Sequence, residues 1–291
     1  MRLADGSEPP GGGLTRFALR TDLSRRAGEV RVAAINLLVA IGAIVIGLPL
    51  VLTLYLSLFD EKFITYPPRG YTLSWYPAII PNFGGPLLVS GELAGLAVVA
   101  SLLLGVPAAI GLYRHRSRLS SAIAALLLAP ITFPDIALSL AIYVFLVLIE
   151  QLTTLEFVGF TGLVLAHVLI TTPWVVRLCL ASLANHDSAA EEAAASLGAR
   201  PITVIRRVTL PAMRAGIVAA ALFAFIVSFD NLAMALFLAA PGVTTLPVAI
   251  LEYLEYHIDP LVAAVAVAQM LIIGAALLVL DRFVRIAQVV R

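Results

Sequence analysis

Apolar residues in this chain form long runs, and short polar stretches separate them. Each run matches or exceeds the roughly 20 residues that an α-helix needs to cross the hydrocarbon core of a bilayer. Six transmembrane helices are predicted, at about residues 32–59, 87–113, 119–149, 161–183, 212–239 and 261–284. The pattern therefore predicts an all-α integral membrane protein.

Two of the runs carry further information. The run at 32–59 exceeds the roughly 7 to 15 apolar residues of a signal-peptide core, so we expect a span that is retained. The run at 119–149 is too long for one straight span and contains Pro130 and Pro134. We expect it to be broken or strongly tilted.

The polar stretches predict a tail and loops. Residues 1–31 are rich in Gly and Pro at the start and then in Arg, which predicts a cytoplasmic N-terminal tail before a transmembrane domain at 32–291. Residues 60–86 predict a loop whose aromatic side chains lie at the membrane interface. The stretch between 239 and 261 predicts a second loop.

Composition narrows the class of protein. The chain of 291 residues is 61% hydrophobic and only 13% charged, with a mean hydropathy of +1.01, whereas soluble domains carry about a quarter charged residues. The net charge of +1 gives no argument for nucleic acid as a partner. The four histidines share no metal-ligand spacing and no Ser/His/Asp constellation is legible, so neither a metal, another cofactor nor enzymatic activity is predicted.

The single lysine gives a further exclusion. Lys62 lies in no glycine-rich loop, so a Walker A phosphate-binding loop with its lysine is absent from the sequence. If a nucleotide drives this protein, another chain must bind it.

The basic residues predict the orientation in the membrane. Sixteen of the 19 Lys and Arg fall in the segments 1–31, 114–118, 200–214 and the C-terminus, and two fall in the alternate segments. By the positive-inside rule, both termini and the polar stretch at 185–211 are expected in the cytoplasm.

The polar stretch at 185–211 predicts a compact helical hook. Ser188 and Glu191 can form a capping box, and the alanine-rich residues after them favour a helix of roughly ten residues. Gly198 can close that helix in the left-handed conformation, and Pro201 can begin a second one. The alternative is an ordinary solvated loop that is rich in alanine.

The same stretch carries a family pattern. Glu192-Ala193-Ala194, then Gly198, then Val208-Thr209-Leu210-Pro211 resembles the cytoplasmic loop of permease subunits in binding-protein-dependent ABC importers. From about residue 87 onward the chain is similar to permeases of the spermidine/putrescine type, because Leu112-Tyr113-Arg114 and Ser228-Phe229-Asp230 match that subgroup. Asn231 stands where the subgroup has a second acid, and Val89-Ser90 where Asn-Ser is usual.

The resemblance implies a fold, partners and docking residues. It implies the type I ABC importer transmembrane fold, as one half of a translocation pathway in the lipid of a bacterial inner membrane. The implied partners are a second permease subunit, a dimer of ATP-binding subunits and an extracytoplasmic solute-binding protein. The residues that would dock the ATP-binding subunits are Glu191, Glu192, Ala193, Ala194, Gly198, Leu210 and Pro211.

Three acidic residues fall inside the predicted spans, where an ionisable side chain is a functional hypothesis by default. Glu92, Asp135 and Asp230 are all expected in the outer half of the membrane, and with Ser228 and Asn231 they form a candidate pathway for a cationic solute.

Each of these acids also has a structural interpretation. Asp135 can form a capping box with Thr132. Glu92 can reach the lipid headgroups, and the region around Asp230 can pack helices through hydrogen bonds of Ser228 or Asn231.

The function predicted from the sequence is import of a polyamine or a related small cation, coupled to ATP hydrolysis by partner subunits. Two alternatives stay open. One is an ABC permease for another small solute, such as iron, a phosphonate or an opine, and the other is an ion-coupled secondary carrier.

Overall fold

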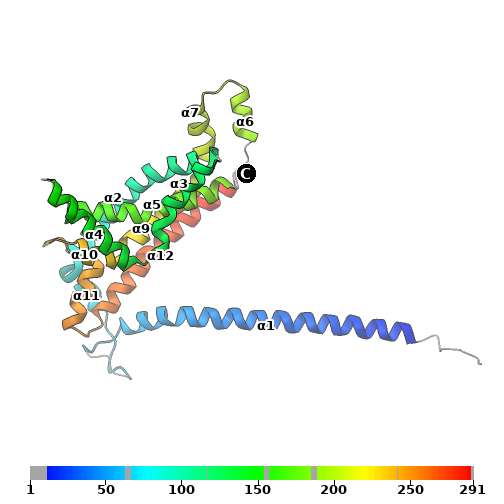
Figure 1. Ribbon diagram of the computed structural model, residues 1–291. Coiled ribbons are helices and arrows are strands. Elements are labelled where there is room, and N and C mark those ends of the chain that lie inside the picture. Colours follow the sequence, from blue (N-terminus) through cyan, green and yellow to red (C-terminus); the bar gives the residue numbers. More distant parts are fainter. Residues whose placement is uncertain are drawn as a thin grey trace, which may run out of the picture. The chain divides into compact units, whose positions relative to one another are not determined.

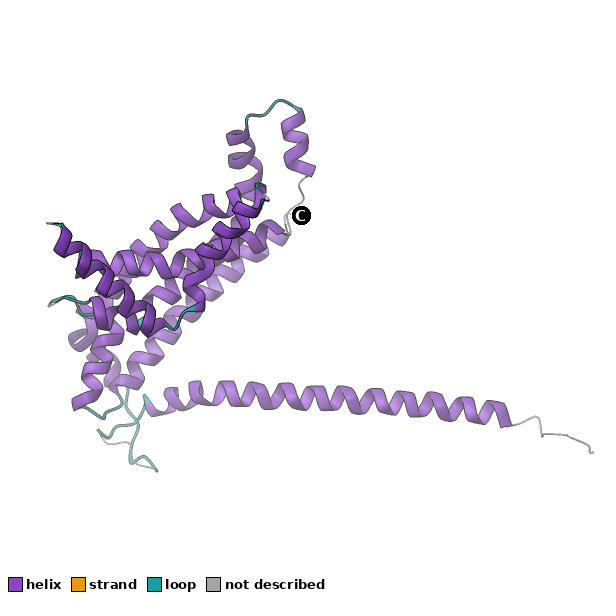
Figure 2. Ribbon diagram, viewed as in Figure 1, coloured by secondary structure: helices purple, strands orange, loops and turns teal. Residues whose placement is uncertain are grey.

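A computed structural model describes residues 12–62, 67–115, 117–153, 157–184, 189–240 and 242–289. These residues are almost entirely helical, and their only extended pairing is an isolated bridge between Phe59 and Tyr71 (Figure 2). The chain divides into two units, residues 1–56 and residues 57–291, which are described separately.

The first unit contains one long helix, α1, at Gly12–Leu56 (Figure 1). Its segment Ile35–Leu56 is long and apolar enough to cross a membrane. Residues 12–31, predicted as a tail, instead continue the helix toward the N-terminus. Leu, Ala and Arg make up half of this segment, and all three have high helix propensity.

The second unit is built around three helices. α5 packs against both α2 and α9, while α12 packs against α2 and α9, and the short helix α10 packs against α4 and α5. The bounds are Trp75–Arg114 for α2, Asp135–Leu152 for α4, Phe160–Ala184 for α5, Arg214–Phe229 for α9, Leu232–Leu238 for α10 and Leu261–Val289 for α12.

Small residues let these helices approach closely. A Cβ atom added to Gly105 of α2 would lie 2.7 Å from a methyl carbon of Val175 in α5. One added to Gly216 of α9 would lie 2.4 Å from the Cβ atom of Ser182, also in α5. Close approach of this kind holds membrane helices together where lipid supplies no hydrophobic force between them.

The start of α2 corrects the prediction for residues 60–86. The helix begins at Trp75, so residues 75–86 are helical although they include Pro81 and Pro86. Proline is tolerated in membrane helices because neighbouring groups satisfy the freed carbonyls. Glu92 therefore lies well inside α2 and not near its end.

The predicted break in the third run is confirmed. Residues 118–152 form α3 at Arg118–Leu128, a short 3-10 helix η1 at Ala129–Thr132, and then α4. Pro130 lies in η1 and Pro134 immediately precedes α4, so the two prolines mark the interruption.

The predicted span at 212–239 is divided in two. α9 ends at Phe229, and α10 begins after Asn231, whose side-chain oxygen accepts a hydrogen bond of 2.8 Å from the Met234 amide. Asparagine is a strong N-cap, and it starts a new helix here inside an apolar run. The predicted loop before residue 261 also contains a helix, α11, at Leu246–Tyr256.

The described residues include five helices that are long and apolar enough to span a membrane, or up to six if a bent pair counts as one span. The bent pair joins Pro201–Ala212 to Arg214–Phe229 at an angle of 69°. Five of the six predicted spans therefore correspond to these five helices, and the predicted span at 212–239 corresponds to α9, the longer member of the bent pair, followed by α10.

The close contact at Gly105 gives a stability prediction. Gly105→Ala should lower the midpoint of thermal unfolding in detergent, because overpacking costs about 1–3 kcal/mol and Val175 cannot swing away as a long side chain could. Gly95→Ala, also in α2, is the matched control, since a Cβ atom there meets nothing within 4 Å. Equal midpoints for the two variants would contradict the close packing of α2 on α5.

Candidate functional site

A helical hook projects from the second unit at the end far from α10 and α11 (Figure 1). It consists of α6 at Ala189–Ser196, α7 at Pro201–Val204, a π-helix η2 at Ile205–Thr209, and α8 at Leu210–Ala212. α6 has eight residues, slightly fewer than the ten predicted. The predicted cap Ser188 lies outside the described residues.

The turn of the hook has the predicted conformation. Gly198 has φ +81°, and its amide bonds to the Ala195 carbonyl at 2.9 Å. The next amide, of Ala199, bonds to the Ala194 carbonyl at 3.1 Å. These bonds close the last turn of α6, and Pro201 then begins α7 where its missing N–H costs nothing.

The tip of the hook presents apolar side chains to its surroundings. Leu197 is 89% exposed and Ile202 is 60% exposed, and no residue of α6 is buried. Glu192 and Ala193 are exposed beside them. Exposed apolar side chains at one tip are typical of a surface that another protein covers.

The seven predicted docking residues differ in exposure. Glu192, Ala193, Gly198 and Pro211 are exposed and Ala194 is partly exposed. Leu210 packs against the apolar cluster around Met213, and Glu191 turns toward the bundle.

Glu191 joins the hook to the end of α2. Its Oε2 accepts a hydrogen bond of 2.8 Å from Nη2 of Arg114, the last residue of α2. Its Oε1 accepts one of 2.6 Å from the hydroxyl of Thr209, the last residue of η2, and that hydroxyl accepts one of 3.2 Å from Arg114 Nη2. We call Arg114, Glu191 and Thr209 the clamp.

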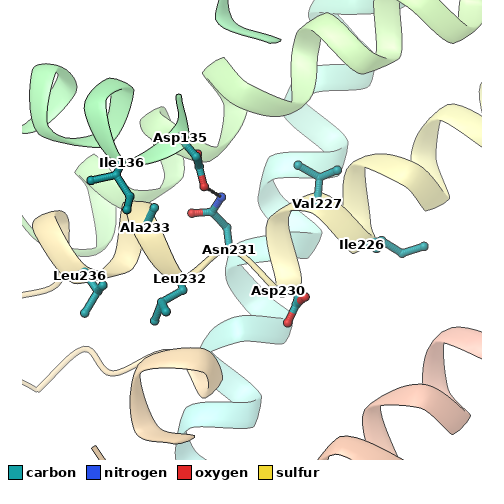
Figure 3. A pocket seen from close by; sticks show the side chains of 9 residues that line it. All are labelled: Asp135, Ile136, Ile226, Val227, Asp230, Asn231, Leu232, Ala233 and Leu236. Atoms are coloured by element: carbon teal, nitrogen blue, oxygen red, sulfur yellow. Dashed lines mark hydrogen bonds between the residues drawn. The ribbon is translucent and has the colours of Figure 1, made fainter. Parts of the chain in front are cut away.

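A pocket of about 420 Å³ lies where α9 gives way to α10, beside the start of α4 (Figure 3). Asp135 and Asn231 face each other there, with the Asn231 amide donating a hydrogen bond of 3.0 Å to Asp135 Oδ2. Asp230 points away from Asp135 on the other side of the connection (Figure 3). The other lining residues are apolar: Ile136, Ile226, Val227, Leu232, Ala233 and Leu236.

The structure thus brings three of the five predicted pathway residues together. Glu92 is exposed on α2 and does not line the pocket. Ser228 is buried beneath it, and its hydroxyl shares a hydrogen bond of 2.7 Å with Nδ1 of His167 in α5. Ser228 therefore makes the helix-packing hydrogen bond that was the alternative to a solute contact.

The capping box of Thr132 with Asp135 is not formed. The Thr132 hydroxyl donates to the Ala129 carbonyl at 2.7 Å, and α4 has Pro134 at its N-cap. Asp135 instead lies in the first turn of α4, where a carboxylate is favoured by the helix dipole.

Sequence reasoning missed three residues at these places: Arg114, Thr209 and His167. Arg114 was read for orientation and for family resemblance, and Thr209 stood between the fixed positions of the Val208 to Pro211 pattern. His167 is a lone histidine in an apolar run, so nothing in the sequence indicated its hydrogen-bond partner. Among the described residues, no group of three His, Cys, Asp or Glu could hold a metal ion.

Helices of this length and hydropathy are typical of a multi-pass membrane protein, and here they carry a hook and a pocket at opposite ends. Residues 97–288 match the model of the family described as binding-protein-dependent transport system inner membrane component, and the chain belongs to this family of ABC importer permeases.

Relatives within the family include permeases named for polyamines. The chain is 31% identical to the putrescine transport system permease protein PotI of Escherichia coli over 78% of this chain and 81% of that one. It is 29% identical to the spermidine/putrescine permease PotC of Haemophilus influenzae, over 74% and 82% of the two chains. A molybdenum transport system permease, ModB of Mycobacterium bovis, is 36% identical over 71% and 81%.

Solved structures share the fold. A chain of a bacterial ABC transporter involved in the import of alginate matches with a TM-score of 0.67 at 17% identity, over 89% of this chain and 98% of that one. A chain of the MetNI methionine ABC transporter matches with a TM-score of 0.60 at 20% identity, over 72% and 97%. The predicted type I importer permease fold is confirmed.

The hydrogen bond between Ser228 and His167 gives a second prediction. Ser228→Ala should lower thermal stability by about 1–3 kcal/mol, because Nε2 of the buried His167 already has no partner and Nδ1 would lose its own. Ser101→Ala is the control, because the buried Ser101 hydroxyl bonds only to carbonyls of its own helix. Thermal stability is measured by tryptophan fluorescence on heating. An equal loss of stability in both variants would contradict a specific contribution of the Ser228–His167 hydrogen bond.

Proposed function

We propose that this permease imports a small organic cation of the polyamine class, with the ATP hydrolysed by separate subunits that dock on the hook. The observation that supports the solute class is the pocket, in which Asp135, Asp230 and Asn231 are the polar lining residues. The chain itself supplies one half of the pathway.

The chemistry of the pocket favours a cation. The two carboxylates among otherwise apolar lining residues would attract ammonium groups and repel anions. The apolar lining on α9 and α10 suits the methylene segments of a polyamine. A volume of about 420 Å³ falls within the roughly 300–1,000 Å³ of typical small-molecule sites.

The relatives name two kinds of solute, and the lining of the pocket favours one of them. Two relatives are named for putrescine or spermidine and one for molybdenum. An anionic solute would meet Asp135 and Asp230 without a basic residue in the pocket lining. The carboxylates therefore support the polyamine class, although the molybdenum permease has the higher identity.

The hook supports docking of ATP-binding subunits. Its tip exposes Leu197 and Ile202 next to Glu192, and it lies on the side of the bundle that carries Arg114, Arg206 and Arg207. The positive-inside rule puts such a basic side in the cytoplasm, where ATP is available. Residues 1–31 and the C-terminus would lie on the same side.

Two further partners complete the proposed importer. A second permease subunit would cover exposed apolar faces of the bundle and supply the other half of the pathway. A solute-binding protein would deliver the cation on the outer side, near the pocket. ATP-driven closure of the docked subunits would move the hook and rearrange the helices around the pocket.

The first test of this function concerns the solute. Asp230→Asn should raise the putrescine concentration needed for half-maximal uptake by about tenfold, since hydrogen bonds to charged groups contribute about 1.5–3 kcal/mol. Uptake of labelled putrescine into proteoliposomes with the complete importer measures it. Glu92→Gln removes a charge outside the pocket and should have little effect. Equal losses in both variants would contradict a specific role for the pocket.

The second test concerns docking. Gly198→Val should weaken attachment of the ATP-binding subunits, because a β-branched residue at φ +81° strains the turn of the hook by about 1–3 kcal/mol. Gly242→Val is the matched control, since Gly242 has φ +88° and, like Gly198, open space around its Cβ position. Co-purification of the ATP-binding subunits should fall only for Gly198→Val, and retention in that variant would refute docking on the hook.

A further inference from the structure

Apolar packing does not fix the position of α6. No residue of this helix is buried, and its neighbours are the other short segments of the hook, α7 and η2. Glu191 provides a polar contact between α6 and α2.

The clamp is a closed ring of three hydrogen bonds. Arg114 Nη2 donates to both Glu191 and Thr209, and Thr209 donates to the remaining oxygen of Glu191. The Arg114 and Glu191 side chains are only 26% and 16% exposed, and Thr209 is buried. A half-buried ring in which the bonds polarise one another is more rigid than an exposed ion pair, which contributes little.

α2, the helix that carries Arg114 of the clamp, takes part in the packing throughout the second unit. It supplies buried residues to each of the three apolar clusters, including Leu93, Ala94 and Ala109. Ser90 of the same helix accepts a hydrogen bond of 2.8 Å from the Leu246 amide at the start of α11. α2 therefore connects the Arg114 end of the bundle with the end that is far from the hook.

We propose that the clamp makes α6 and α2 move as one body, so that Arg114 and Glu191 are positioning residues for coupling and not contacts for the ATP-binding subunits. Both oxygens of Glu191 are occupied within the chain. This inference rests on the proposed docking role of the hook. The ring stays closed while the importer works.

The test measures, in proteoliposomes with the complete importer, how strongly the solute-binding protein stimulates ATP hydrolysis. The solute-binding protein is purified from cells with its own solute bound. For each variant, the rate of ATP hydrolysis with this protein is divided by the rate without it, and this ratio is compared between variants. Arg114→Met and Glu191→Gln should each lower this ratio about fivefold or more, within the range of typical coupling between sites. The ATP-binding subunits should still co-purify.

Two comparisons sharpen the result. Arg118→Met removes a nearby basic residue that takes no part in the clamp, and it should leave the ratio unchanged. The double variant Arg114→Met with Glu191→Gln should fall no further than the single variants, because all the bonds belong to one ring.

Cross-linking tests whether coupling requires that α6 and α2 stay joined. Arg114→Cys with Glu191→Cys should also lower the ratio, and joining the two thiols with a short bifunctional reagent should restore it. The native Cys179 is buried and offers no competing reaction site.

Three results would overturn the inference. The ratio could be unchanged in Arg114→Met and Glu191→Gln, the bridged protein could remain uncoupled, or the clamp variants could lose their ATP-binding subunits. The third result would make the clamp a part of the docking surface. None of them alters the comparison of Gly198→Val with Gly242→Val, which tests docking separately.

Discussion

The contact of α5 with α2 and α9 is the constraint on which the second unit depends. Lipid provides no hydrophobic force between helices, so these three must be held by close van der Waals packing and a few hydrogen bonds. Gly105 and Gly216 permit the approach, and the bond of His167 with Ser228 fixes the end of α9 against α5. The pocket beyond Ser228 and the hook before α9 both take their positions from this contact.

The pocket and the hook lie at opposite ends of the same helix. α9 begins directly after the hook and ends at Phe229, just before Asp230, so one helix connects the two. α2 provides a second, parallel connection through the clamp. A permease needs such links, because solute and nucleotide are handled on different sides of the membrane.

Local chemistry was predictable from the sequence. Apolar runs gave the membrane helices, and the prolines at 130 and 134 gave the break before α4. Gly198 and Pro201 gave the turn of the hook, because left-handed backbone and a first helical turn favour those residues wherever they occur. The family pattern added the class of protein, which the family match confirms.

Contacts between distant parts of the chain were not predictable. Glu191 and Arg114 are 77 residues apart, and no periodicity indicates that they meet. The side of α9 on which Ser228 lies depends on the packing of α5, and the new helix start at Asn231 was hidden within an apolar run. The continuous helix through residues 12–31 was not predicted, because their polar composition indicated a tail.

The bend of 69° at Met213 has a mechanical consequence. Met213 is buried in the cluster that includes Val175 and Ala220, so the bend is packed inside the bundle. A force directed along α7 and η2 runs largely across the axis of α9. Such a force would tilt α9 about Met213 and not push the helix lengthwise, and the hydrogen bond of Ser228 with His167 would carry α5 along with the end of α9 beside Asp230.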